Sequence, residues 1–275
     1  MNIKYVNHLN EELDLSGVPY LLQNCDAFDY SWEPSMVARS DNKSKVESFK
    51  RTSKKFTAEL LIKDDDFTAA VNRFFEITEK DIVANELGRL VLESGEYLPC
   101  FITESKHTGF HLRNRWDNRQ LAILSPHPFW VKEITRTFLP GISTMEQQYL
   151  DYDHDYNYDY ASGVIIDELN VPHYSACDFE MVIYGPCDNP RVVIGDNVYE
   201  VFDTISSGEY IVIDSRKHSV VKYRTNGTTL NLYDMRGKKR SVFDKIPAGN
   251  SSVSRNSEFG FDLKLFIERS EPKTW

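Results

Sequence analysis

The fold is decided by three neighbouring stretches of the sequence: VVIGDNVYEVF (192–202), EYIVIDS (209–215) and VVKYRTNGTTLNLY (220–233). The first contains two strand-like runs around Gly-Asp-Asn. The third contains two such runs around Asn226-Gly227, and an Asn-Gly pair between apolar runs is among the strongest short-range signals for a β-hairpin. Several short strands at close spacing predict an antiparallel sandwich or barrel in this half of the chain.

Period-two alternation predicts two further strands. In KKFTAELLIK (54–63), one face carries Phe56, Ala58, Leu60 and Ile62. In FGFDLKLFIE (259–268), one face carries Phe259, Phe261, Leu263, Leu265 and Ile267, and Phe266 is the exception. The 15 Tyr and 16 Phe of the chain favour strands as well, because aromatic rings pack well on half-buried pleated surfaces.

The only helical signal lies near residues 67–87. Phe67, Val71 and Phe74 recur at helical spacing behind acidic residues, which suit a helix start. We expect a second short helix to begin at Thr78, with Thr78 and Asp81 forming a capping-box-like pair and Gly88 ending the helix.

Three connections are predicted between these elements. The charged stretch DNKSKVESFKR (41–51) is interpreted as a loop, and WDNR (116–119) as a hairpin turn followed by the return strand QLAIL. The region from Pro140 to Tyr160 has little apolar periodicity and is the natural domain boundary. We therefore expect an N-terminal β domain over 1–145, with helices near 67–87, and a C-terminal β-sandwich over 146–275.

Composition bounds the class of protein. A chain of 275 residues with 41% hydrophobic and 27% charged residues is an ordinary globular composition with room for two domains. Its formal net charge of −10 gives no basic footprint for duplex DNA. No signal peptide and no membrane-spanning run is legible, so we expect cytosolic synthesis and no membrane insertion. The four cysteines, Cys25, Cys100, Cys177 and Cys187, are expected to be reduced and mostly buried.

No motif for catalysis or cofactor binding is present in the sequence, and no catalytic, cofactor-binding or metal residue is assigned. Asp151, Asp153 and Asp155 alternate with aromatics, and the favoured interpretation is an extended linker in preference to a Ca²⁺ site. His107 and His111 have helical metal-site spacing, but Gly109 and strand-like surroundings argue against zinc.

A cluster of basic residues lies in SKVESFKRTSKK (44–55) and comprises Lys45, Lys50, Arg51, Lys54 and Lys55. The simplest interpretation is a solvated loop. The alternative is contact with a negatively charged partner, and an acidic protein neighbour fits better than nucleic acid because the chain as a whole is acidic.

The sequence resembles the distal tail proteins of siphophages and related prophage tails. The residues that carry the resemblance in the second half are DYNYDY (155–160), MVIYGPCDNPRVVIGDNVYEVFDTISSGEYIVIDS (181–215), NLYD (231–234), SVFDKIPAG (241–249) and FGFDLKLFIERSEP (259–272). In the first half they are FFEITEKDI (74–82), GRLVL followed by YLPCFI (88–102), and PFW (128–130).

This resemblance implies a non-enzymatic structural hub of a phage tail tip or baseplate. The N-terminal domain would assemble into a hexameric ring that continues the tail tube, and the C-terminal domain would be a galectin-like, jelly-roll type β-sandwich outside it. The implied partners are the tail tube protein, the tape-measure protein and a tail-tip or receptor-binding protein. The implied location is the virion tail, after synthesis in the bacterial host.

Two other functions stay open at this point. Galectin-like sandwiches can bind sugars on an aromatic-lined face, so a carbohydrate-binding module is the main alternative. An enzyme that degrades cell-wall glycan would need two carboxylates at a defined separation in a cleft, and 42 acidic residues single out none.

Overall fold

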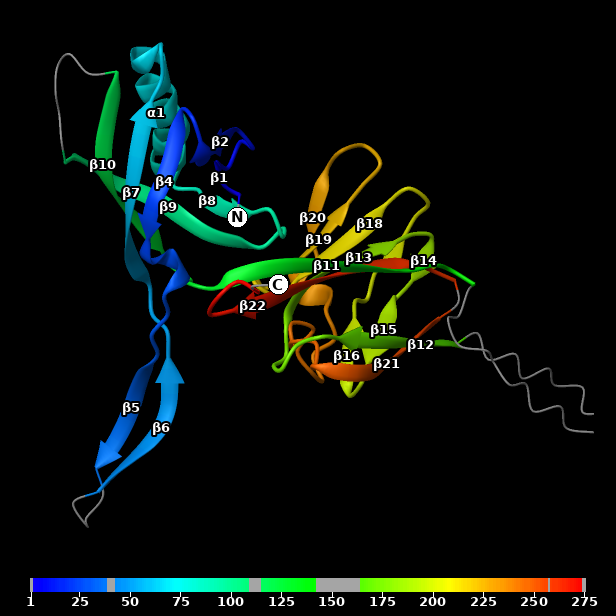
Figure 1. Cartoon of the computed structure of the whole chain (residues 1–275). Coiled ribbons are helices and arrows are strands. Elements are labelled where there is room, and N and C mark those ends of the chain that lie inside the picture. Colours follow the sequence, from blue (N-terminus) through cyan, green and yellow to red (C-terminus); the bar gives the residue numbers. More distant parts are fainter. Residues whose placement is uncertain (1, 39–42, 109–114, 142–163, 257, 274–275) are drawn as a thin grey trace, which may run out of the picture. The chain divides into compact units, whose positions relative to one another are not determined.

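The computed structural model describes residues 2–38, 43–108, 115–141, 164–256 and 258–273. This part of the chain is mainly β with a single α-helix, α1 (Phe67–Ala84), which confirms the predicted fold class (Figure 1). The chain forms two compact units, Met1–Lys132 with Glu268–Trp275, and Glu133–Ile267. Strands β11 (Trp130–Phe138) and β22 (Phe261–Arg269) each contain residues of both units. The expected domains, 1–145 and 146–275, stay a prediction.

The first unit is built on a curled antiparallel sheet with the order β2-β1-β8-β9-β10-β7-β4-β3. Its strands are β1 (Ile3–Val6), β2 (Glu12–Asp14), β3 (Ser16–Gly17), β4 (Tyr20–Cys25), β7 (Lys54–Lys63), β8 (Gly88–Leu92), β9 (Tyr97–His107) and β10 (Trp116–Ser125). The long strand β9 pairs with β8 through its first residues and with β10 through its second half. Strand β9 therefore belongs to both halves of the sheet, and the sheet curls where β9 changes its pairing partner from β8 to β10.

Strand β7 lies between β4 and β10 and confirms the alternation predicted for residues 54–63. Phe56, Ala58, Leu60 and Ile62 are all buried in the core of the first unit. The turn predicted at 116–119 is wrong, because Trp116–Arg119 is the start of strand β10 and pairs with β7. Two polar residues of this segment, Asp117 and Arg119, are themselves buried and form an ion pair at 2.9 Å.

The two predicted helices are one continuous helix. Asp66 caps α1 by accepting a hydrogen bond from Ala69 N at 3.1 Å. Thr78 is not a cap but a buried residue, and its hydroxyl donates to the carbonyl of Phe74 at 2.9 Å. The helix ends at Asn85, which adopts the left-handed conformation (φ 53°), before the expected glycine stop.

Asp81 is fully buried in the first unit and joins the end of α1 to strand β1. Its carboxylate accepts hydrogen bonds from the Tyr5 hydroxyl and from His8 N at 2.9 Å, and His8 Nδ1 lies 2.5 Å away. Burial, followed by the hydrogen bond to Asp81, raises the pKa of Tyr5. Gly88 packs directly against this cluster, where a Cβ atom would overlap with Asp81 Oδ2 and the Tyr5 hydroxyl.

The second unit is a β-sandwich. One sheet has the order β20-β19-β18-β13-β22-β11, and the other has the order β12-β21-β15-β16. The strands not yet bounded are β12 (Val164–Val171), β13 (Asp178–Tyr184), β14 (Cys187–Asp188), β15 (Arg191–Ile194), β16 (Asn197–Glu200), β17 (Thr204–Ile205), β18 (Tyr210–Asp214), β19 (Ser219–Tyr223), β20 (Thr229–Asn231) and β21 (Gly249–Asn256). Apolar side chains from both sheets form one core.

The turns predicted in this unit are confirmed. Gly195 (φ 56°) lies between β15 and β16, and Gly227 (φ 79°) lies between β19 and β20. Both positions need a residue that tolerates positive φ. The alternation predicted for 259–268 is confirmed in β22, and the exceptional Phe266 is buried under the guanidinium of Arg216, 3.3 Å from its ring centroid.

A buried ion pair closes one end of the sandwich. The guanidinium of Arg255 donates to Asp167 Oδ2 at 2.8 Å and to the carbonyl of Leu139 at 2.6 Å. Its carbon lies 5.8 Å from the ring centroids of both Phe138 and Phe261, which stack on each other at 4.5 Å. The pair therefore ties β21 to its neighbour β12 and to the chain that leaves β11.

Replacing Gly88 with Ala is expected to destabilise the first unit by about 1–3 kcal/mol, because the added methyl group overlaps with a buried hydrogen-bonded cluster. Gly17→Ala is the matched control, since nothing lies within 4 Å of its added Cβ, and it should change stability by less than about 0.5 kcal/mol. Urea unfolding followed by tryptophan fluorescence measures both variants, with buried Trp130 as the reporter. Equal stability of the two variants would contradict the packing described.

Replacing Arg255 with Ala is expected to lower the local stability of the sandwich by about 3–5 kcal/mol, because it leaves the Asp167 carboxylate buried without its cation. Arg136→Ala, at an exposed position of β11, should change it by less than about 0.5 kcal/mol. Hydrogen exchange of the backbone amides in β12 and β21 gives the free energy of opening. Unchanged exchange in the Arg255 variant would show that the pair does not support these strands.

Candidate functional site: a projecting hairpin and an acidic groove

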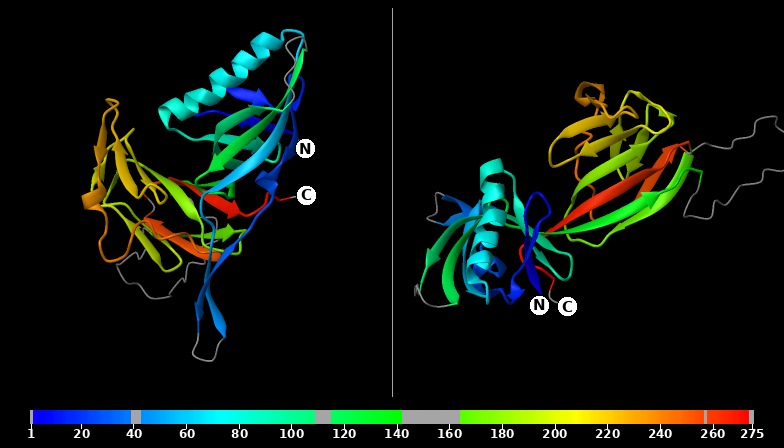
Figure 2. Two further views of the ribbon diagram at one scale, coloured as in Figure 1. Left: turned by 90° about the vertical axis from the view of Figure 1, so that its left-hand side faces the viewer. Right: turned by 90° about the horizontal axis from the view of Figure 1, so that it is seen from above.

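A two-stranded hairpin projects from the first unit (Figures 1 and 2). It consists of β5 (Glu33–Ala38) and β6 (Ser44–Lys50), which form a separate sheet in the described part of the chain. We call residues 33–50 the arm. The prediction of a loop over 41–51 is therefore wrong for residues 44–50, which form a strand exposed on both faces.

The arm is amphipathic because of its register. Pro34 pairs with Phe49 and Met36 with Val46, and a bulge separates these two pairs. Partners in a strand pair lie on the same face, so one face of the arm carries these four apolar side chains. Met36, Val46 and Phe49 are 59%, 42% and 60% exposed. Exposed, contiguous apolar side chains of this kind mark an interaction surface.

The predicted basic cluster separates into two groups in the structure. Lys45 and Lys50 lie exposed on the arm, on the face opposite Phe49. Lys54 Nζ donates to the carbonyl of Asp29 at 3.3 Å, and Lys55 pairs with Glu104 at 2.9 Å, so both are engaged within the first unit. Only part of the cluster is therefore available to a partner.

Arg51 fastens the base of the arm. Its guanidinium carbon lies 4.7 Å from the ring centroid of Phe129 and 5.8 Å from that of Trp32, and the two rings meet edge to face. Burial lowers the pKa of Arg51 from its usual range. A basic residue that looked available for binding is thus a structural clamp, and no local sequence signal marks it, because Trp32 and Phe129 are distant from Arg51 along the chain.

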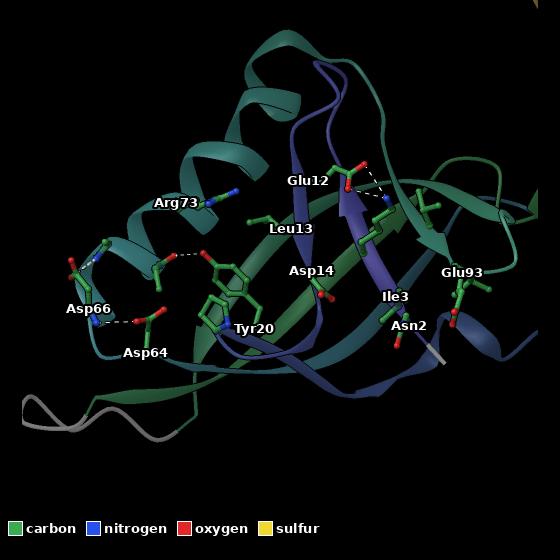
Figure 3. A pocket seen from close by; sticks show the side chains of 16 residues that line it. Asn2, Ile3, Glu12, Leu13, Asp14, Tyr20, Asp64, Asp66, Arg73 and Glu93 are labelled. Carbon is green, nitrogen blue, oxygen red and sulfur yellow. Dashed lines mark hydrogen bonds and ion pairs between the residues drawn. The ribbon is translucent and has the colours of Figure 1, made fainter.

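A groove of about 750 Å³ lies in the same unit (Figure 3). It is formed by the first half of α1, by strands β1, β2 and β8, and by the residues before β4 and α1. Its floor is apolar and includes Ile3, Leu13, Tyr20, Ala70 and Leu92. The Tyr20 hydroxyl donates to the carbonyl of Ala70 at 2.8 Å and so holds the helix against β4.

The rim of the groove is acidic. Its carboxylates are Glu12, Asp14, Asp64, Asp66 and Glu93, and its cations are Lys4 and Arg73. Lys4 is paired with Glu12 at 2.8 Å, so the remaining carboxylates dominate the local field. An apolar floor with a negative rim suits a protein segment that presents apolar side chains beside lysines.

The other candidate residues do not form a metal site in the described part of the chain, where no group of three or more potential ligands occurs. His107 Nδ1 lies 2.8 Å from Asp117 Oδ2, and its proposed partner His111 lies outside the described residues. Asp151, Asp153 and Asp155 also lie outside them.

The four cysteines are free thiols, and Cys100, Cys177 and Cys187 are buried. Burial raises the pKa of Cys25 and raises that of Cys187 to about 11, so neither thiol is activated as a nucleophile. Among the described helices, none is long and apolar enough to cross a membrane.

Three tyrosines form a row across the outer face of the sandwich. Tyr184 pairs with Tyr210, and Tyr210 pairs with Tyr223, on adjacent strands. The rings of Tyr210 and Tyr223 are nearly parallel, with centroids 4.8 Å apart. Such rings turn their faces toward each other and form no flat platform for a sugar. Burial and a hydrogen bond to Asp262 raise the pKa of Tyr184 to about 12. The row therefore gives no reason to prefer the sugar-binding alternative.

Replacing Arg51 with Ala should loosen the arm, because a cation–π contact of this kind contributes about 0.5–2 kcal/mol. We expect hydrogen exchange of the arm amides to accelerate by about 2- to 30-fold in the monomer. Lys45→Ala is the control, since Lys45 lies on the arm without an aromatic partner among the described residues, and it should leave exchange at the base unchanged. Equal effects of the two variants would show that Arg51 does not hold the base.

Comparison with solved structures finds the same fold over the whole chain. A chain of the phage P2 baseplate, in its activated conformation with Ca, matches with a TM-score of 0.66 and 12% identity, covering 98% of this chain and 99% of that one. The Dit (gp 19.1) protein of SPP1, described as a paradigm of hub adsorption apparatus in phages that infect Gram-positive bacteria, matches with a TM-score of 0.60 and 8% identity over 97% and 99%. No protein-family model and no curated protein matches the sequence.

Proposed function

We propose that this protein is a structural hub of a phage tail tip, in which six copies form a closed ring. The observation that supports it best is a fold shared, over nearly the whole of both chains, with a chain of a phage baseplate and with a hub protein of a phage adsorption apparatus. At 8–12% identity this likeness concerns the fold, so the function needs a second argument from the chain's own surfaces.

A closed ring of identical subunits needs two different patches that fit each other. The arm and the acidic groove are such a pair. The arm presents Met36, Val46 and Phe49 on one face and Lys45 and Lys50 on the other, and the groove presents an apolar floor with an acidic rim. An arm seated in the groove of the next copy would bury its apolar face on the floor, and the long lysine side chains of its other face would reach the carboxylates of the rim.

A bound partner would also stabilise the arm. A two-stranded hairpin without further packing is marginally stable, and both of its edges carry backbone groups open to pairing. A neighbouring copy would satisfy both needs. The proposal thus keeps the expectation that residues 44–55 meet an acidic neighbour, and assigns that role to Lys45 and Lys50.

The proposed partners follow from the hub role: the tail tube protein, the tape-measure protein and a tail-tip or receptor-binding protein, with the virion tail as the location. The role requires no chemistry, and the protein is proposed to be non-enzymatic. The second unit is proposed to be the galectin-like domain. The tyrosine row of the second unit offers no observation in favour of a platform for a neutral sugar.

The solution mass of the purified protein is expected to be six times 31.9 kDa at high concentration, measured by light scattering and followed by negative-stain imaging. A monomer at every concentration, together with failure to assemble on the tail tube protein, would remove the ring from the proposal. Assembly on the tube protein alone would keep the hub and show that the ring forms on its neighbours.

Charge reversal tests the assigned interface. The double variant Lys45→Glu/Lys50→Glu should weaken self-association by roughly tenfold, since exposed ion pairs contribute about 0.2–1 kcal/mol each and like charges oppose contact. Adding Asp14→Lys/Glu93→Lys, at rim carboxylates not paired with Lys4, should restore most of it. Lys132→Glu/Lys273→Glu, which changes the charge equally outside both surfaces, should have little effect. A ring unaffected by the first double variant would leave the hub standing but place the interface elsewhere.

A further inference from the structure

A concentrated positive charge lies in the second unit of this acidic protein. The segment RGKKR (236–240), which follows the 3-10 turn η2 (Tyr233–Met235), places four cations within five residues of a chain whose net charge is −10. Neighbouring cations repel one another, so such a loop is at a disadvantage unless an anion lies near it.

The loop is held against strands β15 and β16 at several points. Arg236 forms a β-bridge with Val201, and Gly237 N donates to the carbonyl of Glu200 at 2.8 Å. The Arg240 guanidinium donates to the carbonyl of Asp196. Backbone hydrogen bonds fix the first end of the loop and the Arg240 side chain fixes the other, so its charges are positioned before any ligand arrives.

Between the loop and the strands lies a hollow of about 270 Å³. It is lined by Arg191, Val198, Glu200, Gly237, Lys239 and Arg240. Three cations therefore face one carboxylate, and Arg191 Nε is 3.9 Å from Glu200 Oε1, beyond a close hydrogen bond. The lack of a side chain at Gly237 lets the loop lie close to Glu200, because a Cβ atom at this position would lie 3.3 Å from Glu200 Oε2.

This combination matches one ligand chemistry. Arginine and lysine bind phosphate through charge-assisted hydrogen bonds, and a carboxylate beside them accepts hydrogen bonds from hydroxyl groups. The lining contains no aromatic ring, so nothing in it would stack on a nucleobase as single-strand binders do. A nucleic acid therefore fits less well than a small hydroxylated phosphate.

We propose that this hollow, called here the basic pocket, binds a phosphate ester of a polyol or sugar, either free or as the repeat of a phosphodiester-linked polymer. Lys239, Arg240 and Arg191 hold the phosphate, and Glu200 accepts a hydrogen bond from a hydroxyl group of the ester. Lys238 adds to the field outside the lining. The proposal is independent of ring formation.

Calorimetric titration of the full-length protein with poly(glycerol phosphate) at two salt concentrations tests the site. We expect binding that weakens as salt rises, and a loss of at least tenfold in Lys239→Gln/Arg240→Gln. Arg136→Gln/Arg224→Gln removes the same charge from exposed positions of the same unit and should stay within twofold of the original protein. Equal losses in both double variants, or no loss in the first, would overturn the proposal.

Two further binding experiments identify the ligand class. Glycerol phosphate monomer that competes with the polymer at millimolar concentration would assign recognition to the single ester, and a polymer-only response would assign it to the repeat. Glu200→Gln should reduce the preference for glycerol phosphate over inorganic phosphate. A single-stranded oligonucleotide of equal charge that binds as tightly as the polymer, with the same dependence on Lys239 and Arg240, would show general polyanion binding and contradict the polyol class.

Discussion

The buried carboxylate of Asp81 is the constraint on which the first unit depends. A charge with no exposure to solvent is costly unless hydrogen bonds replace its water, and here the Tyr5 hydroxyl and the His8 backbone and ring supply them. These donors belong to β1 and the turn after it, whereas Asp81 lies near the end of α1. The helix can therefore occupy only the position in which its last turn meets β1, and Gly88 is needed for the close approach.

The groove follows from this constraint. Its two long walls are the first half of α1 and the strands β1 and β8, and Asp81 fixes their relation at one end while Tyr20 fixes it at the other. The groove is thus not a gap left by loose packing but the space between two elements tied at both ends. The arm shows the opposite design, since a single clamp of Arg51, Trp32 and Phe129 holds its base and its strands extend without a core.

The parts of this fold that could be predicted from sequence are those in which one face of a strand is buried. Residues 54–63 and the C-terminal strand were predicted correctly, because burial imposes a period of two. The strands around Asn226-Gly227 were predicted from their turn, since β20 is exposed along its whole length. The arm was missed for the same physical reason. A strand exposed on both faces has no alternation to detect, so SKVESFK reads as a charged loop. The prediction that a second helix begins at Thr78 was wrong, because residues that cap helices, such as Thr78 and Asp81, also serve as buried hydrogen-bonding groups.

The candidate surfaces show a second limit of sequence reasoning. The groove is lined by residues from positions 2 to 93, and no local sequence pattern predicts that they lie together. The basic cluster at 44–55 was visible, but its division into free lysines and a clamped arginine depends on the rings of Trp32 and Phe129. The sequence shows RGKKR only as a run of cations. The hollow that this loop lines forms only because β15 and β16 pack beside it.

The arm and the basic pocket are the two surfaces for which binding is proposed, one for assembly and one for recognition. In each unit a buried charge meets its partners within that unit, Asp81 in the first and Arg255 with Asp167 in the second. The arm and the RGKKR loop are both at a disadvantage when unoccupied, one through exposed apolar area and the other through crowded positive charge. A binding partner that covers the apolar area or neutralises the charge removes this disadvantage, so the bound state of each segment is favoured over the free state.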